Sequence, residues 1–308
     1  MVMQPLPSSF MRTIRGFSGG AAWLDGLPDL LAECAQRWQL EIAPPFELSF
    51  NYVAPCRLPD GSEAVLKVGL PNPELATEIE ALHAWAGEGA VRLMFGDPQR
   101  GILLMERIIP GTPVYKLEDD AKATEIAADV LRALSRHAPP DGTFPDLYRW
   151  TRSLRTVRDR FAGGTGPLPE PLLTLAQRLA QDLIASSPEP RLLHGDLHHW
   201  NILRRQDAGR DIWLAIDPKG VVGDPAFDIG PWMYNPLPDL LRADNPRKIL
   251  ARRVDQFVDL LALDRQRVVA WGVAECVLSA CWSIEDAGEA DWWQGTLTVA
   301  GLLAEMLR

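Results

Sequence analysis

The spacing of hydrophobic and polar side chains changes near residue 110 of this 308-residue chain. Before that point, apolar and polar positions alternate over short stretches, namely FELSF (46–50), EAVLKV (63–68) and GILLMER (101–107). Alternation with a period of two is typical of half-buried strands, and PDGS (59–62) carries turn-forming residues. The first part of the chain is therefore predicted to contain a small β-sheet.

One helix is predicted within this β-rich part, over residues 73–89. Its apolar residues recur at intervals of three or four, Pro73 stands at its start and Gly87 lies near its end, which are the usual signals of an amphipathic helix and its limits. The helix follows directly on the strand that contains Lys67.

After Pro110-Gly111 the pattern becomes mainly helical, with apolar stripes at helical spacing. Residues 191–230 interrupt the helices with short apolar runs, RLL with NILRR and DIWLAID, which predict a β-hairpin with polar residues at its ends. A later stretch, residues 270–287, is too apolar for a surface helix and is predicted to lie at the centre. The predicted fold class is α+β, with a small α/β lobe followed by a larger, mainly helical lobe.

Composition narrows the classes of function. A content of 47% hydrophobic and 23% charged residues indicates a folded, soluble protein, and 41 acidic against 31 basic residues give a net charge of -10. This charge disfavours a nucleic-acid partner and mildly favours a cationic substrate. The chain begins without the apolar region of a signal peptide and no stretch is predicted to span a membrane, so we expect a cytoplasmic protein. Its four cysteines lack the CxxC spacing of zinc sites and are expected to be buried, reduced thiols.

The strongest candidate chemistry lies in LLHGDLHHWNIL (192–203) and WLAIDPKG (213–220). Asn201 follows Asp196 by five positions, and Asp217 stands directly after an apolar strand. Phosphoryl transfer needs a carboxylate near the attacking hydroxyl and oxygen ligands for Mg²⁺, and protein kinases space a base, an Asn ligand and an Asp ligand in this order. A loop cap and a turn residue are the ordinary alternative for such residues, but the combination of all three favours a phosphotransfer site.

An independent signal comes from Lys67, which lies on the inner face of the strand AVLKV and needs an anion there. Glu78 follows on the predicted helix and is placed to hold the lysine toward the phosphates of a nucleotide. Glu80 is a close competitor for this pairing.

The motifs HGDLHHWNIL, IDPKGVVGDPAFDIG and AVLK resemble the aminoglycoside phosphotransferase family. The sequence motifs IDPKG and GDPA, together with SFNYVAPCRLPDG, are similar to those of its streptomycin 6-phosphotransferase and hydroxyurea phosphotransferase branch. The resemblance spans about residues 45–290. It implies a protein-kinase-like two-lobed fold, with a small β-sheet N-lobe and a larger helical C-lobe. It also implies ATP and Mg²⁺ as cofactors, and transfer of the γ-phosphoryl group to a hydroxyl of a small molecule.

The resemblance also implies roles for individual residues. Residues 1–107 would be the nucleotide-binding lobe with a leader helix, and 108–308 the lobe with the catalytic loop and substrate pocket. Asp196 would be the catalytic base, Asn201 and Asp217 the metal ligands, Lys67 the phosphate-binding lysine and Glu78 its partner. The backbone at the hinge would meet adenine, at Met105, Glu106 and Ile108. A glycine-rich phosphate loop is absent from the sequence, so LSFNYVAP (48–55) would have to use Ser49 and backbone N–H groups instead.

For the acceptor, the acids Glu285 and Asp286 beside Trp282 are candidates for an anionic, aromatic pocket that binds guanidinium or ammonium groups. Glu289 and Asp291 belong to the same acidic stretch, and an acidic solvated turn with packing tryptophans is an equal alternative. Other polar residues have simpler interpretations. Asp224 is expected to cap the helix that follows it, and His194 to hydrogen-bond the backbone as a scaffold.

The predicted function is ATP-dependent O-phosphorylation of a small molecule, with a streptomycin 6-phosphotransferase that gives antibiotic resistance as the leading hypothesis. The alternatives are a kinase for hydroxyurea or another small hydroxylated metabolite, and a nucleotide-binding pseudokinase or regulatory module. The intact set of Lys67, Asp196, Asn201 and Asp217 argues against the pseudokinase. The sequence leaves open the acceptor hydroxyl, the choice of ATP over GTP and the oligomeric state.

Overall fold

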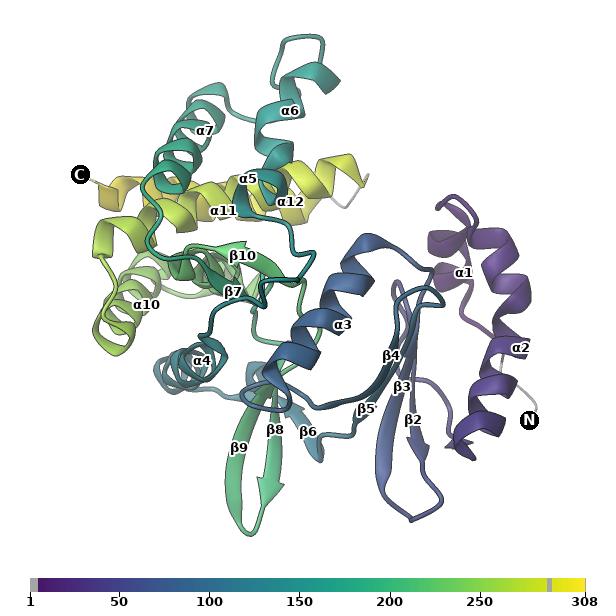
Figure 1. Cartoon of the computed structure of the whole chain (residues 1–308). Helices are drawn as coiled ribbons and strands as arrows, with labels where there is room; N and C mark the ends of the chain where they lie inside the picture. The colour runs from purple at the N-terminus through teal and green to yellow at the C-terminus, as the bar shows by residue number, and fades with distance from the viewer. Residues whose placement is uncertain (1–4, 287–289, 308) are drawn as a thin grey trace. The chain divides into compact units, whose positions relative to one another are not determined.

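The computed structural model describes residues 5–286 and 290–307, with side chains at 290 and 291 left undescribed. The chain divides into two compact units, Met1–Gly111 and Thr112–Arg308 (Figure 1). Each unit is described by itself below.

The first unit contains an antiparallel five-stranded sheet of order β1-β2-β3-β5-β4. Its strands are β1 (Glu41–Ile42), β2 (Tyr52–Arg57), β3 (Glu63–Val68), β4 (Leu93–Asp97) and β5 (Ile102–Glu106). The prediction of a small sheet is confirmed, but the predicted strand over residues 46–50 is wrong. Pro44 and Pro45 interrupt the pairing after β1: the N–H groups of Ala43 and Phe46 still donate to carbonyls of β2, but residues 46–50 form no strand.

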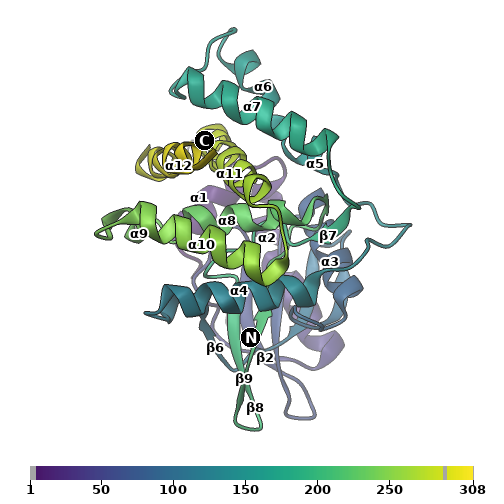
Figure 2. The ribbon, with the colours of Figure 1, turned by 90° about the vertical axis from the view of Figure 1, so that its left-hand side faces the viewer.

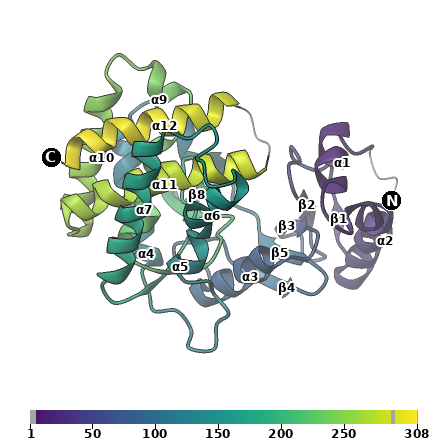
Figure 3. The same ribbon diagram turned by 90° about the horizontal axis from the view of Figure 1, so that it is seen from above.

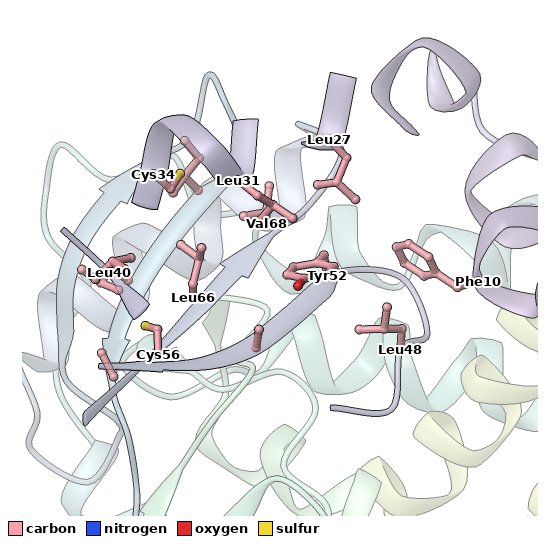
Figure 4. Close-up of a cluster of buried hydrophobic side chains, with 14 of the residues drawn as sticks. Phe10, Leu27, Leu31, Cys34, Leu40, Leu48, Tyr52, Cys56, Leu66 and Val68 are labelled. Atoms are coloured by element: carbon pink, nitrogen blue, oxygen red, sulfur yellow. The ribbon is translucent and has the colours of Figure 1, made fainter. Parts of the chain in front are cut away.

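The leader of this unit consists of two helices, α1 (Ser8–Arg15) and α2 (Gly20–Trp38), where a single helix was predicted. Leu27, Leu31 and Cys34 of α2 project toward the sheet, where they meet Leu66 and Val68 of β3 (Figure 4). All five side chains are buried. The free energy gained by removing this apolar surface from water holds β3 in place, and β3 carries Lys67 on its other face.

Helix α3 (Pro73–Trp85) follows β3 as predicted. The Asn72 side chain accepts the N–H of Leu75 at 2.9 Å, which caps the helix at its start. The helix ends four residues before the predicted end at 89, because Ala86 and Gly87 both adopt the left-handed conformation, with φ of 52° and 90°.

The second unit is mainly helical. Its helices are η1 (Val114–Lys116), α4 (Asp120–Leu134), α5 (Leu147–Trp150), α6 (Arg152–Arg160), α7 (Glu170–Ala185), η2 (Pro225–Ile229), α8 (Gly230–Tyr234), α9 (Asp239–Arg242), α10 (Pro246–Leu261), α11 (Arg265–Glu285), α12 (Ala290–Ala304) and η3 (Glu305–Leu307). Figure 2 shows α7, the pair α11 and α12, then α10 and α4 in successive layers, with the β8–β9 hairpin beyond α4.

Helix α11 lies at the centre of this unit, as predicted. It packs on α7, α8 and α12, and it runs beside α12 in Figure 3. Its residues 268–281 are all buried. By length and hydropathy α11 could cross a membrane, but 78% of its most apolar window is buried inside the protein, which is the behaviour of a core helix.

Two small sheets complete the second unit and position its loops. One has the order β6-β8-β9 and the other pairs β7 with β10. Their strands are β6 (Pro110–Pro113), β7 (Arg191–Leu193), β8 (Ile202–Asp207), β9 (Arg210–Ala215) and β10 (Val221–Gly223). The predicted hairpin is confirmed for β8 and β9, whereas the RLL strand pairs with β10 instead.

This topology brings two loops together. Residues 194–201 lead from β7 to β8, and residues 216–220 lead from β9 to β10. Because β7 pairs with β10 and β8 pairs with β9, both loops cross between the same two sheets side by side. These are the loops that carry Asp196 and Asp217.

Candidate active site

His194 joins the two loops. Its buried ring accepts the N–H of Asp196 through Nδ1 at 3.2 Å and donates from Nε2 to the carbonyl of Ile216 at 2.9 Å. Burial disfavours the charged imidazolium and lowers the pKa of His194 to about 3, so the ring is neutral. The expectation that His194 is a scaffold residue is confirmed.

The backbone before Asp196 is fixed by Gly195 and Asp228. Gly195 has φ of 82°, and a Cβ there would lie 3.0 Å from both Lys219 Cβ and Val221 Cγ2, so the tight loop requires glycine. The N–H groups of His194 and Gly195 donate to the two carboxyl oxygens of Asp228, each at 2.7 Å. The buried Asp228 carboxylate thus fixes the backbone of this loop.

Asp228 is a buried residue of this loop network that the sequence analysis did not single out. It lies in η2 between buried Phe227 and Ile229, and burial raises its pKa to about 7 despite the two N–H bonds, which favour the charged form. The available signal was an acid within the apolar run AFDIG. A buried acid needs hydrogen-bond donors, and here the backbone N–H groups of the loop 194–201 supply them.

Asn201 connects Asp196 to the second loop. Its Nδ2 donates to the Asp196 carbonyl at 3.0 Å, and its own carbonyl accepts the N–H of Ile216 at 2.9 Å. The first bond engages the amide nitrogen and so orients the Asn201 side chain, with the amide oxygen left for another partner. The second bond places Asn201 next to the residue that precedes Asp217.

Asp217 has φ of 60°, in the left-handed region that costs a non-glycine residue about 1–2 kcal/mol. Such conformations occur where the surroundings hold a functional side chain in one direction. Just beyond it, the N–H of Lys219 donates to the His194 carbonyl at 2.7 Å. The structure therefore brings Asp196, Asn201 and Asp217 onto two loops that are bonded to one another.

In the first unit, Lys67 Nζ donates to both carboxyl oxygens of Glu78, each at 2.7 Å. Both side chains are only 6% exposed. A buried ion pair of this kind is retained only with good geometry and matched charges. The structure thus pairs Lys67 with Glu78, as predicted.

The remaining nucleotide candidates also lie in or just after the first unit's sheet. Ser49 is exposed at a bend before β2, and Met105 and Ile108 are buried at the end of β5 and beyond it. The Glu106 carboxylate accepts the N–H of Arg92 at 2.9 Å, which ties β5 to the start of β4. Its side chain is therefore engaged in the sheet, while backbone groups remain the predicted contact with adenine.

The acidic end of α11 is partly engaged within the protein. Glu285 accepts a hydrogen bond from Ser153 Oγ at 2.9 Å, and the Trp282 ring packs edge-on against Trp150 at 5.6 Å. Asp286 is exposed at the helix C-terminus. Glu289 lies outside the described residues, as does the side chain of Asp291. Of the predicted acceptor residues, Asp286 is thus the one that faces solvent.

Asp224 is a structural residue, as expected. Its Oδ1 accepts the N–H of Ala226 at 3.0 Å, which caps η2, and its Oδ2 forms an ion pair with Arg267. This pairing anchors η2, and with it Asp228, to α11.

Glu275 of α11 is a second residue that sequence reasoning left without a role. It is buried against Gly230, where a Cβ would lie 2.2 Å from Glu275 Cγ, so only glycine leaves room for it. Neither of its carboxyl oxygens has a hydrogen-bond partner among the described residues. Burial, and then the charges of Asp196 and Asp228, raise the pKa of Glu275 well above its usual value.

With this geometry in place, the chain can be compared with known proteins. The family described as "Aminoglycoside/hydroxyurea antibiotic resistance kinase" matches residues 38–287. A streptomycin 6-kinase of Streptomyces glaucescens is 32% identical over 301 residues, which cover 94% of this chain and 92% of the relative. A hydroxyurea phosphotransferase of Kitasatospora aureofaciens is 35% identical over 301 residues, covering 94% and 82% of the two chains.

Solved structures show the same fold at lower identity. A choline kinase from Streptococcus pneumoniae matches with a TM-score of 0.63 and 15% identity, over 91% of this chain and 99% of the other. An amicoumacin kinase in complex with AMP-PNP and Ca²⁺ matches with a TM-score of 0.61 and 13% identity, over 91% and 93%. The predicted protein-kinase-like fold, with a β-sheet N-terminal part and a helical C-terminal part, is confirmed.

Proposed function

This chain belongs to the aminoglycoside/hydroxyurea antibiotic resistance kinase family, and from that premise we propose that it phosphorylates streptomycin at its 6-hydroxyl, with ATP as donor. Kinases of this family are ATP-dependent phosphotransferases that act on a hydroxyl group of a small molecule. The observation that carries the proposal is the pair of bonded loops with Asp196, Asn201 and Asp217, within a chain 32% identical to a streptomycin 6-kinase.

In the proposed reaction, Asp196 orients the acceptor hydroxyl and takes its proton. The hydroxyl oxygen forms a bond to the γ-phosphorus as the bond to the ADP oxygen breaks. Three hydrogen bonds of the loop support this role, because they fix the backbone on both sides of Asp196 through His194, Asp228 and Asn201. Catalysis is then a matter of positioning and electrostatics.

Mg²⁺ is proposed as the metal, and the donor set fits it. Asn201 and Asp217 offer an amide oxygen and a carboxylate, the hard oxygen ligands that Mg²⁺ takes beside substrate phosphates. The bond from Asn201 Nδ2 to the Asp196 carbonyl supports this assignment, since it leaves the amide oxygen for a ligand role. Bound Mg²⁺ would neutralise charge on the phosphates.

For the nucleotide, we propose that Lys67 binds the α- and β-phosphates and that Glu78 holds it in position. The bidentate pairing at 2.7 Å supports the second role. Ser49 with nearby N–H groups would contact the phosphates, and the backbone from Met105 through Glu106 to Ile108 would contact adenine. For the acceptor, exposed Asp286, with Glu285 and Trp282, is a candidate surface for a cationic group.

Hydroxyurea is the second candidate acceptor, because the hydroxyurea phosphotransferase shares the higher identity of 35%. Another small hydroxylated metabolite would keep the same donor chemistry. The net charge of -10 supports a small-molecule partner over nucleic acid, and a cytoplasmic location remains part of the proposal.

The test is mass spectrometry of products after incubation with Mg-ATP and a panel of streptomycin, other aminoglycosides, hydroxyurea, sugars and amino alcohols. We expect phosphorylated streptomycin from the wild type. Asp196→Asn should lower turnover about 10²- to 10⁴-fold, the usual contribution of a positioned base, while ATP binding persists. A different phosphorylated acceptor would replace streptomycin in the proposal, and ATP binding without any product would favour the regulatory alternative.

A further inference from the structure

A half-buried tyrosine stacks on an exposed tryptophan of the loop that carries Asp196. Tyr115 of η1 and Trp200 of the loop stack with ring centroids 4.7 Å apart and an interplanar angle of 24°. The N–H of Tyr115 donates to the His199 carbonyl at 3.1 Å, which fixes η1 against the loop. Trp200 nevertheless remains 36% exposed, although it directly precedes Asn201. A rigid aromatic surface is therefore offered to solvent beside the reacting residues.

His198 connects this pair to the catalytic carboxylate. Its ring lies edge-to-face with the Trp200 ring, with centroids 5.8 Å apart. Its Nδ1 accepts the backbone N–H of Trp200 at 3.3 Å. A neutral ring with Nδ1 as acceptor carries its proton on Nε2. That nitrogen lies 3.8 Å from Asp196 Oδ2. The rings of His198, Trp200 and Tyr115 thus contact one another in sequence, and the His198 end of this series lies beside the Asp196 carboxylate.

Accessible carboxylates lie at both ends of the series. At one end the Asp196 side chain is 31% exposed. At the other, the Tyr115 hydroxyl donates to Asp239 at 3.0 Å, and the Asp239 side chain is 50% exposed. Aromatic faces and carboxylates both attract cations, and a flat guanidinium stacks on an indole better than a neutral group does.

Two cationic side chains of the protein, Lys116 and Arg242, already contact the Tyr115 ring and Asp239. Lys116 Nζ lies 5.3 Å from the Tyr115 ring centroid, in a cation–π contact. Arg242 lies 3.6 Å from Asp239, in an ion pair whose arginine is largely exposed. Both cations are on the Tyr115 side, so the Trp200 side next to Asp196 is where a ligand cation would be bound.

We propose that Trp200 and Tyr115, with His198 and Asp239, form the acceptor subsite and that it takes a planar cationic group such as a guanidinium. A hydroxyl on the same molecule then reaches Asp196. The inference rests on the proposed function and makes its acceptor class specific. It places the cation-binding surface on the catalytic loop and η1 rather than at the acidic end of α11.

The experiment measures acceptor binding by calorimetry in the full chain without ATP, so that no turnover interferes, and ATP binding in a separate titration without acceptor. The probes are streptomycin, which carries guanidinium groups, and hydroxyurea, which is uncharged. Trp200→Leu should raise the Kd for streptomycin about 5- to 30-fold and leave the Kd for hydroxyurea and for ATP within about twofold. Trp200→Phe should restore part of the affinity, because it keeps an aromatic face.

Trp213→Leu on β9 is the matched control, a half-buried tryptophan outside the subsite, and it should leave streptomycin binding unchanged. Unchanged streptomycin affinity in Trp200→Leu, with a loss in Asp286→Asn, would overturn the subsite in favour of the α11 surface. The two proposals also fail separately. Phosphorylation of streptomycin with the same KM in wild type and Trp200→Leu rejects the subsite alone, whereas Trp200-dependent binding without phosphorylation rejects the function and supports the subsite.

Discussion

Two pairs of buried ionisable residues, one pair in each unit, are stabilised in different ways. In the first unit, Lys67 and Glu78 face each other as a cation and an anion. In the second, Asp228 and Glu275 are both acids, and neither is paired with a cation among the described residues. Asp228 is stabilised by two backbone N–H groups, and Glu275 by retaining its proton. The stability of the first pair depends on a partner side chain. The stability of the second depends on the loop that donates to Asp228 and on the pH at which Glu275 keeps its proton.

Removing the partner should cause the largest loss of stability. Lys67→Met removes the cation that donates to both carboxyl oxygens of buried Glu78, which should lower the free energy of unfolding by about 3–5 kcal/mol. Urea denaturation of the full chain measures this loss. The double variant Lys67→Met with Glu78→Leu should recover most of it, because the buried charge is then gone.

Glu80→Gln is the matched control for this pair. Glu80 is a half-buried acid on the same helix, and its replacement should change stability by less than about 1 kcal/mol. A double variant no more stable than Lys67→Met alone would show that the pairing does not account for the loss.

In the second unit, the corresponding change is Asp228→Ala. It leaves the N–H groups of His194 and Gly195 buried without an acceptor, at a cost of about 2–4 kcal/mol. Asp228→Asn keeps one acceptor oxygen and should lose about half as much. Urea denaturation gives both values, and steady-state kinetics should show a lower kcat for Asp228→Asn with the KM for ATP little changed, since Asp228 holds the loop and not the nucleotide. Equal stability of the Ala and Asn variants would contradict this account.

The contrast between the units also explains how far the sequence could be interpreted. Strand alternation, the helix after Lys67 and the spacing of Asp196, Asn201 and Asp217 are local patterns, and the fold they predict is confirmed. The strand over residues 46–50 was wrong because alternation alone does not show that a segment goes on pairing with a neighbouring strand.

Other features depend on contacts between distant segments. Asp228 and Glu275 each look like an isolated acid in an apolar run, and only the folded chain shows that both lie near Asp196. The stacking of Tyr115 on Trp200 joins η1 to the catalytic loop, and no periodicity in the sequence records it. Pairing partners were easier to predict within one α/β unit, as for Lys67 and Glu78, than across several helices.

The last test of the comparison concerns pH, because its effect is absent at low pH and grows as the pH rises. Burial raises the pKa of Glu275 well above 4.5, so the folded protein retains a proton that the unfolded chain releases once the pH exceeds about 4.5. The contribution of Glu275 to the free energy of unfolding is therefore fully present below that pH. It is lost as the pH rises toward the folded pKa. Glutamine does not titrate. Glu275→Gln should consequently gain stability relative to wild type by about 1.4 kcal/mol for each pH unit between 4.5 and the folded pKa of Glu275.

Urea denaturation of both proteins at pH 5, 6.5 and 8 measures this gap. Asp25→Asn on α2, an exposed acid of the first unit, is the control and should show a constant difference from wild type across the series. A gap between Glu275→Gln and wild type that stays constant with pH would mean that Glu275 is ionised in the folded state. It would then need a cation or a hydrogen-bond donor beyond those of the described residues, and its charge would be compensated by a partner, as that of Glu78 is by Lys67.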